Sequence, residues 1–133
     1  MAIQFSVAVR NARLDAIESA IGVSPTLEIR SGAPPVNPAA ADTGTVLATL
    51  ALPSDYMAAA SAGSKQLLGT WQDLAADATG TAGHFRLKQG ATTHMQGTIT
   101  ATGGGGDMLL DNTSLATGQQ FTINGFTINE PHA

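Results

Sequence analysis

The sequence predicts a mainly β protein, an antiparallel β-sandwich of about eight strands with one short helix near the N-terminus. Two observations predict this class. Short stretches in which apolar and polar residues alternate recur along the chain, and turn-forming residues separate them at intervals of about 8 to 12 residues. Only one stretch, close to the N-terminus, has the apolar spacing of three to four residues that is typical of a helix. A jelly roll is one topology that fits this series of strands.

The composition is consistent with a single sandwich domain over residues 1–133. Of the 133 residues, 43% are hydrophobic, which is enough to form a packed core in a domain of ordinary size. Only 12% are charged, whereas typical domains contain about 25% charged residues. The surface is therefore expected to consist largely of small and uncharged polar residues. Such a surface loses little hydration free energy when a neighbouring subunit covers it.

The first element is expected to be a strand over residues 2–9. Apolar side chains occupy every second position of this stretch, which is the period of a half-buried strand. Its apolar face is a candidate contact surface for a partner, and an ordinary core strand is the alternative. The residues assigned to this contact are Ile3, Phe5 and Val7.

A helix is predicted over about residues 12–21, because the apolar spacing changes there to three and four residues. Asn11 is in the position of an N-cap, and Gly22 stands where a C-terminal glycine is expected. A helix packed over the open end of a sheet explains this pattern, with a partner-binding helix as the alternative. The polar side chains expected on its outer face are Arg13, Asp15, Glu18 and Ser19.

A strand over residues 26–30 is followed by a long loop rich in proline, residues 31–44. Proline has no backbone N–H to donate to a sheet, so this segment is expected to be extended and outside the strands. Loops of this length are often functional, so it is a second candidate contact element. A solvated crossover between two sheets is the alternative. The loop residues assigned to a partner contact are Pro34, Pro35 and Val36.

The middle of the chain is expected to contain a strongly apolar strand over residues 45–52, which ends at Pro53. Residues 54–60 could form a helical turn capped by Ser54. A further strand over residues 65–72 contains the only tryptophan, Trp71.

The C-terminal half begins with the clearest alternation of the chain, at residues 84–88, which is expected to pair with the threonine-rich stretch 92–101 as a hairpin. Four glycines at 103–106 predict a flexible connection to a short strand at 107–110. Residues 119–129 change their apolar phase at an Asn-Gly step. A bulge in one long strand is favoured there, and a hairpin turn is the alternative.

The charge balance and the absence of cysteine exclude several classes of protein. Ten acidic residues against six basic ones give a net charge of −4, which leaves no basic field for a nucleic acid partner. With no cysteine, the chain has no disulfides, thiolate metal sites or cysteine nucleophiles. No apolar run is long enough to span a membrane, and the N-terminal residues lack the pattern of a signal peptide. The protein is therefore expected to be made in the cytoplasm and to have no membrane partner.

No catalytic or cofactor motif is recognisable, so we expect a protein that is not an enzyme and has no cofactor or metal. The glycine run lacks the following helix of a dinucleotide site and the Gly-Lys-Ser/Thr of a phosphate loop. His84 and His94 lie on the predicted hairpin without a third metal ligand. Asp107, Asp111 and Asn112 could supply oxygen ligands to calcium, but the dense Asp/Asn alternation and the closing Glu of a calcium-binding loop are absent. No Gly-x-Ser-x-Gly turn occurs.

The aromatic residues offer one further alternative, a platform on which a sugar ring stacks. With 5% aromatic residues in the chain, the protein core is the better place for them. The three residues concerned are Tyr56, Trp71 and Phe85.

Several segments give the chain a resemblance that runs nearly from end to end. They are VRNARLDAIESAIG, SPTLEIRSGAPP, ADTGTVLATLALPSD, TWQD, ATGTAGHFRL and DNTSLATGQQFTINGFTI. The chain resembles small structural proteins of tailed bacteriophages and prophages, and among them it looks most like a capsid decoration, or cement, protein. This resemblance implies a small β-rich homo-oligomer that binds the major capsid protein and resides in the virion. A tail- or fibre-associated protein, with glycan binding as one role, is the alternative. The resemblance marks no catalytic residue.

Overall fold

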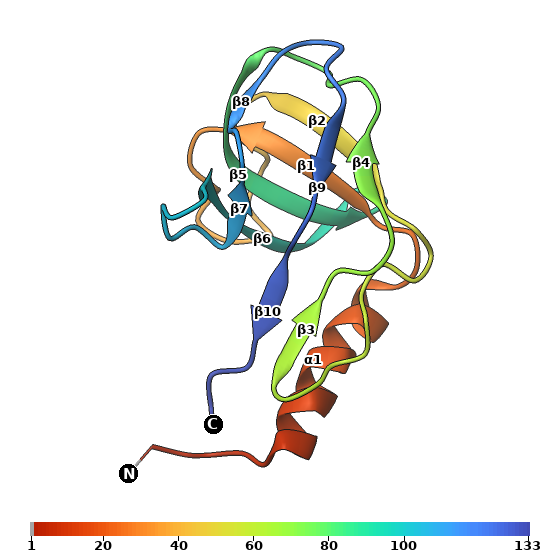
Figure 1. Cartoon of the computed structure of the whole chain (residues 1–133), viewed down its shortest axis with the longest axis vertical. Coiled ribbons are helices and arrows are strands. Elements are labelled where there is room, and N and C mark those ends of the chain that lie inside the picture. The colour runs from red at the N-terminus through yellow and green to blue at the C-terminus, as the bar shows by residue number, and fades with distance from the viewer. Residues whose placement is uncertain (1) are drawn as a thin grey trace.

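The structure, a computed structural model, describes residues 2–133. The described residues form one helix and ten strands, and the fold is mainly β with a helix near the N-terminus, as the sequence predicts (Figure 1). In chain order the elements are α1 (Val7–Ile21), β1 (Thr26–Ser31), β2 (Val46–Ala51), β3 (Ser64–Gln66), β4 (Trp71–Asp73), β5 (Gly80–Gln89), β6 (Thr92–Ala101), β7 (Met108–Leu110), β8 (Ser114–Leu115), β9 (Phe121–Ile123) and β10 (Thr127–Asn129).

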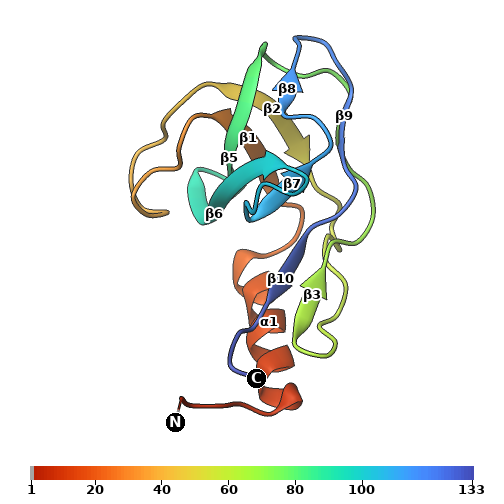
Figure 2. The same cartoon turned by 60° about the vertical axis from the view of Figure 1, so that its left-hand side comes forward.

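The elements form two tiers. In the upper tier of Figure 1 a curled sheet in the order β2-β1-β5-β6-β7, with β8 paired to β5, is faced by the β4-β9 pair. The resulting fold is sandwich-like. The lower tier contains α1 and the β3-β10 pair, and both ends of the chain lie beside it (Figures 1 and 2). We call these parts the sandwich and the lower tier.

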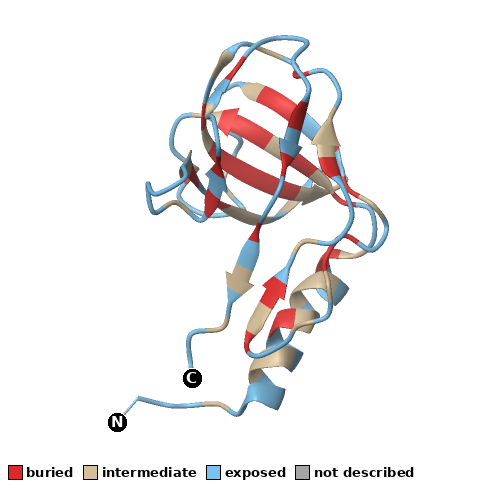
Figure 3. Ribbon diagram, viewed as in Figure 1, coloured by how far each residue is buried: buried red, intermediate tan, exposed pale blue. Residues whose placement is uncertain are grey.

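The core lies between the curled sheet and the β4-β9 pair, where Figure 3 shows buried residues on facing strands. Trp71 is at its centre, and its indole N–H donates to the backbone oxygens of Tyr56 (3.1 Å) and Leu68 (3.2 Å). The ring of Phe126 lies 5.9 Å from that of Trp71 and 5.5 Å from that of Phe85. Tyr56 and Phe85 are also buried, so none of the three aromatic residues considered as a sugar platform reaches the surface.

The N-terminal prediction is wrong in one respect, because residues 2–9 do not form a strand. The helix begins at Val7, earlier than predicted, and Ser6 is its N-cap, with its hydroxyl oxygen accepting from the N–H of Val9. The alternation is misleading because Val7 and Val9 are exposed rather than packed against a sheet. The predicted C-terminal end of the helix is confirmed at Gly22, whose φ of 91° suits glycine.

The strands predicted at 26–30, 45–52 and 107–110 and the hairpin of 84–88 with 92–101 are confirmed as β1, β2, β7 and β5-β6. One pairing departs from the antiparallel expectation, since β6 and β7 are parallel. The glycine run makes this possible: Gly103 and Gly105 have positive φ, so the chain can return within a few residues. The N–H of Gly106 closes the turn by donating to the hydroxyl of Thr100 (3.0 Å).

Three other expectations are corrected, and the described strands number ten rather than about eight. Residues 54–60 are not helical, because Met57 forms a β-bridge with Leu67. The strand predicted at 65–72 is divided into β3 and β4 around Gly69, whose φ is 75°. Residues 119–129 contain neither a bulged strand nor a hairpin, since β9 pairs with β4 and β10 with β3. The phase change at 124–126 marks the passage from the sandwich to the lower tier.

No helix within residues 2–133 combines the length and the apolar character needed to cross a membrane.

Candidate functional site

The segment between β1 and β2 is the most distinctive part of the surface. We call residues 32–43 the proline loop; it extends from one side of the sandwich in Figure 2 and folds back over charged side chains of the sheet. These side chains come from neighbouring strands, because the register places Glu28 opposite Arg86 and Arg30 opposite His84. The loop and this sheet face together form the candidate site.

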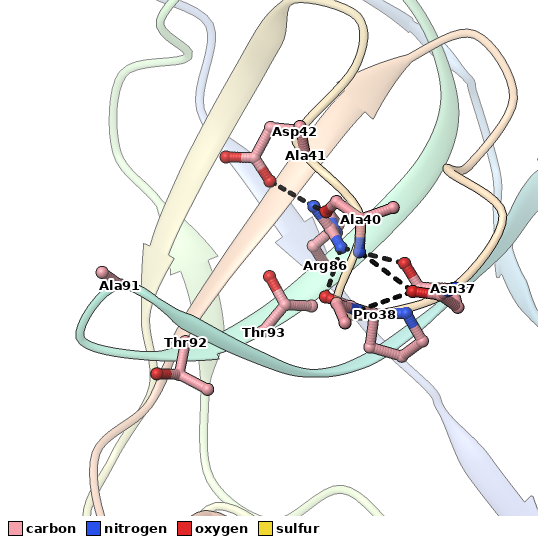
Figure 4. A pocket seen from close by; sticks show the side chains of 10 residues that line it. Asn37, Pro38, Ala40, Ala41, Asp42, Arg86, Ala91, Thr92 and Thr93 are labelled. Carbon is pink, nitrogen blue, oxygen red and sulfur yellow. Dashed lines mark hydrogen bonds and ion pairs between the residues drawn. The ribbon is translucent and has the colours of Figure 1, made fainter.

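Arg86 is the main anchor of the proline loop. Its side chain is only 1% exposed and lies under the loop (Figure 4). The guanidinium donates to the backbone oxygens of Pro38 (2.8 Å), Ala40 (3.1 Å) and Asn37 (3.4 Å), and it forms an ion pair with Asp42. The planar guanidinium presents several donors in fixed directions, so one side chain can hold a whole turn of the loop.

Three further side chains hold the remainder of the loop. The amide of Gln96 donates to the backbone oxygen of Pro35 at 2.7 Å. The Nδ1 of His84 lies 2.9 Å from the backbone oxygen of Gly32, so it carries the proton of that bond. Arg30 donates to the backbone oxygen of Thr43 at 3.2 Å. The loop is therefore attached to the sheet at its beginning, middle and end.

Asp42 connects the loop to a group of cations on the sheet. Its carboxylate lies 2.6 Å from Nζ of Lys88 and 3.2 Å from the guanidinium of Arg30, in addition to the Arg86 pair. The hydrogen bond from Lys88, followed by those charges, lowers the pKa of Asp42 below its usual value. Glu28 shares the same cations, at 2.9 Å from Arg30 and 3.0 Å from Lys88.

The loop exposes one large apolar side chain, that of Val36. It is 90% exposed, whereas the preceding Pro35 is buried and Pro34 is partly covered. Of the three loop residues assigned to a partner contact from the sequence, only Val36 is therefore fully available. Beside it, residues 37–42 and 91–93 border a shallow hollow with Arg86 at its base (Figure 4).

The residues assigned to a contact at the N-terminus lie elsewhere, at the foot of the lower tier (Figure 1). Ile3 and Val7 are exposed. Phe5 is partly covered, because its ring contacts the ring of His132 and lies under the guanidinium of Arg13. The structure therefore does not bring the two predicted contact elements together into one surface.

The other candidate residues do not converge on a reaction centre. His84 is buried and opposite Thr98 in the hairpin register, so it does not face His94. Asp107 accepts from the backbone N–H and hydroxyl of Thr98 and so closes the β6-β7 turn. Within residues 2–133, no group of three or more His, Asp or Glu side chains could hold a metal ion.

Sequence reasoning missed the two fully buried cations, Arg86 and Lys65. It placed the charges of 84–88 in solvent because they alternate with the core residues Phe85 and Leu87. That face does point away from the core, but the proline loop covers it. One signal was present: a loop with several prolines lacks backbone N–H groups, so its carbonyl oxygens need donors from side chains.

Comparison of the chain with protein-family models, with curated proteins and with solved structures finds no match. The resemblance to phage structural proteins therefore stays a prediction, and the geometry of the proline loop is the starting point for a functional proposal.

Proposed function

We propose that this chain is a non-enzymatic structural protein of a phage particle, a capsid decoration protein that binds the major capsid lattice through the tip of the proline loop. The observation that carries the proposal is the combination of an anchored loop with a fully exposed apolar tip, Val36. The resemblance of the sequence and the low content of charged residues support the same role.

The anchoring matters because a loop that is ordered before binding loses less conformational entropy when it binds. The prolines restrict the backbone, and Arg86 holds the turn that follows Val36. Valine is not among the residue types that usually dominate an interface, so an exposed valine on such a support is expected to add a small apolar contact. Burial of its side chain contributes about 1.5 kcal/mol per contact, a modest gain that a repeating lattice multiplies.

The surroundings of Val36 also favour a partner with an uncharged, apolar surface over a partner with a charged surface. Each of the three cations Arg30, Arg86 and Lys88 is paired with Asp42 or Glu28 within the sheet and loop, which leaves the cluster with one net positive charge. A partner surface that covers the loop tip therefore meets mainly proline, alanine and valine side chains. On a capsid, such contacts between adjacent subunits would strengthen the lattice against the pressure of packaged DNA.

Binding to expanded empty capsids of the phage or prophage that encodes the chain tests the proposal. Purified protein should co-sediment with the capsids, and Val36→Asp should weaken binding at least tenfold, because it places a charge in the apolar contact. Val23→Asp is the matched control, since Val23 is also a well-exposed valine but lies in the turn after α1. Absence of capsid binding, with antibodies against the chain labelling tails of intact particles, would overturn the proposal.

A further inference from the structure

The coil between β9 and β10 contains Asn124, whose side chain makes no hydrogen bond to any residue in 2–133 and is exposed. It differs in this from the other four asparagines, whose side-chain oxygens all accept a hydrogen bond. Asn11 accepts from the N–H of Gly63 (2.9 Å), Asn37 from the N–H groups of Ala39 and Ala40 (both 2.9 Å), Asn112 from the N–H of Ser114 (2.9 Å) and Asn129 from the hydroxyl of Ser64 (2.5 Å). The fold therefore fixes every asparagine side chain except that of Asn124.

The residue that follows Asn124 is a glycine, and its backbone nitrogen is also unrestrained. Asn124-Gly125 is the only Asn-Gly pair of the sequence. No oxygen of the described chain accepts a hydrogen bond from the N–H of Gly125. Gly125 is exposed, and a Cβ at this position would meet no atom within 4 Å. A side-chain amide and the backbone nitrogen next to it are thus both accessible to solvent and held by no hydrogen bond.

The other asparagines lack this combination. Asn37 is followed by proline, which has no N–H. Asn112 is followed by threonine, whose branched side chain crowds the backbone. Asn129 is followed by Glu130, whose N–H already donates to a backbone oxygen next to β3 (3.0 Å). Asn11 lies inside α1, where the backbone is fixed by the helix.

We propose that Asn124 is a site of spontaneous deamidation in the folded protein, with water as the only co-reactant. Asparagine is among the thermolabile residues of proteins. The Gly125 nitrogen gives its proton to solvent base and attacks Cγ of Asn124. The new N–Cγ bond displaces the side-chain amide nitrogen, which takes up a proton and leaves as ammonia, and a five-membered succinimide is formed.

Hydrolysis of the succinimide completes the reaction without oxidation or reduction. Water adds to one of the two ring carbonyl carbons and breaks the bond from that carbon to the nitrogen. Cleavage at Cγ gives aspartate, and cleavage at the main-chain carbonyl carbon gives isoaspartate. Both products replace a neutral amide by a carboxylate. In isoaspartate the main chain runs through Cβ and Cγ, so it is one atom longer than before.

The extra atom of isoaspartate falls between two fixed points of the fold. Ile123 is buried and pairs with Trp71. Phe126 is buried as well, and its ring lies 5.9 Å from that of Trp71 and 5.5 Å from that of Phe85. Only two residues separate Ile123 from Phe126, so a longer main chain must displace the Phe126 ring or the end of β9.

This displacement affects the junction between the two tiers. Figure 1 shows a single stretch of coil that leads from β9 in the sandwich to β10 in the lower tier. At its end the backbone oxygen of Phe126 accepts from the N–H of Leu67 at 3.1 Å, directly before β10 pairs with β3. Formation of isoaspartate at Asn124 therefore loosens the attachment of β10. The inference is independent of any role in a capsid.

Peptide mass spectrometry of the full chain, after incubation at mildly alkaline pH, measures deamidation at each asparagine as a gain of about 1 Da. Asn124 is expected to react at least tenfold faster than Asn112, the matched asparagine in another turn. Its rate should lie within tenfold of the rate in the chain unfolded by guanidinium chloride, because the fold does not protect it. A smaller ratio between the two asparagines, or stronger protection by the fold, would overturn the proposal.

Gly125→Ala identifies the attacking nitrogen. The added methyl group hinders attack by that nitrogen but meets no atom of the fold, so the rate at Asn124 should fall at least tenfold with an unchanged thermal midpoint. An unchanged rate would show that the amide is hydrolysed without the Gly125 nitrogen, which contradicts the succinimide step.

The effect on the junction is measured on the isoaspartate product, separated by anion exchange and identified with an isoaspartate methyltransferase. Asn124→Asp is the matched control, because it has the new charge without the longer main chain. The isoaspartate form should melt at least about 3 °C below Asn124→Asp. Amide NMR signals of Leu67 and Phe126 should shift in the isoaspartate form alone. Equal midpoints and spectra would refute the loosening of β10.

Discussion

Two buried cations each join parts of the chain that are distant in sequence. Lys65 is 1% exposed, and its Nζ lies 2.7 Å from Oδ1 of Asp15, 2.9 Å from Oε1 of Glu18 and 2.9 Å from the backbone oxygen of Ala58. An ammonium group has three donors, so each of them has an acceptor. Burial lowers the pKa of Lys65, but the hydrogen bonds to Asp15 and Glu18 outweigh it and the net pKa is raised. Lys65 therefore stays charged and fastens β3 to α1, as Arg86 fastens the proline loop to the sheet.

Replacement of this ammonium is the first prediction. Lys65→Met keeps most of the apolar stem but removes three hydrogen bonds, so the free energy of unfolding should fall by about 2 kcal/mol. Urea denaturation measures this change. Arg13→Met is the control, because the side chain of Arg13 is half exposed in its pair with Glu130, and the loss there should be at most about 1 kcal/mol. Equal losses in the two variants would show that the buried contacts of Lys65 add no more stability than the pair of Arg13 with Glu130.

The polar residues of the helix explain why sequence reasoning fails at this point. Asp15 and Glu18 were expected on the solvent side, since they alternate with the apolar positions of the helix. In the structure they face the segment 58–65, and Asp15 also accepts from the backbone N–H of Ala60 at 2.9 Å. Their partner Lys65 lies 50 positions beyond Asp15 along the chain. Helical periodicity describes neighbours within one turn or two, so it contains no information about such a contact.

At the scale of elements, the alternation of apolar and polar residues was reliable where one face of a strand packs on the core and the other does not. It located β1, β2 and the β5-β6 hairpin, because their apolar side chains do face the core. It failed at residues 2–9, where the alternating apolar side chains belong to a segment outside any strand and to the first turn of a helix. It failed again at 119–129, because short strands that change partners leave too few residues for a period to be read. For the candidate site, the sequence identified the loop and Val36 but not the anchors beneath them.

The contact between β5 and the beginning of the proline loop leads to the second prediction. A Cβ on Gly83 would lie 2.2 Å from the backbone oxygen and 2.8 Å from the backbone nitrogen of Gly32. Gly83→Ala must therefore displace the loop from the strand and disturb the His84–Gly32 hydrogen bond. We expect a loss of about 1 to 3 kcal/mol in unfolding free energy, measured by urea denaturation.

Gly125→Ala is the matched control for this substitution. A Cβ at Gly125 meets no atom within 4 Å, and its φ is not in the positive range. Its unfolding free energy should stay within about 0.5 kcal/mol of the wild type. Amide shifts in NMR spectra should change around Gly32 in the Gly83 variant alone. A Gly83→Ala protein as stable as the Gly125 variant would mean that the loop moves freely over β5.

At the scale of the whole molecule, the two tiers share one core. Ile21 of α1 belongs to the same buried cluster as Trp71 of the sandwich, and Ile17 and Ile128 of the lower tier pack against that cluster. The ion pairs are distributed in the same way, since Asp15 holds the lower tier and Asp42 holds the proline loop. Loss of either tier therefore exposes part of a common apolar surface, and the chain should unfold as one cooperative unit.

Acid unfolding tests whether the two tiers unfold together. Hydrogen bonds from Lys65 and Lys88 lower the pKa of Asp15 and of Asp42, respectively, below the ordinary 3.8. The unfolded chain therefore takes up protons at a higher pH than the folded chain, so the stabilisation is complete above about pH 4 and is lost as the pH falls through the lowered pKa values. Trp71 fluorescence reports on the sandwich and ellipticity at 222 nm on α1, and both should change at the same pH.

The substitution Asp42→Asn separates the contribution of the loop from general acid effects. It should lower stability near pH 7, because Arg86 and Lys88 lose a carboxylate, and it should make the fall in stability below pH 4 less steep. Asp111→Asn, at an exposed position in the turn after β7, is the charge-matched control. If ellipticity changed at a higher pH than Trp71 fluorescence, the lower tier would unfold first, and the shared cluster would be too weak to couple α1 to the sandwich.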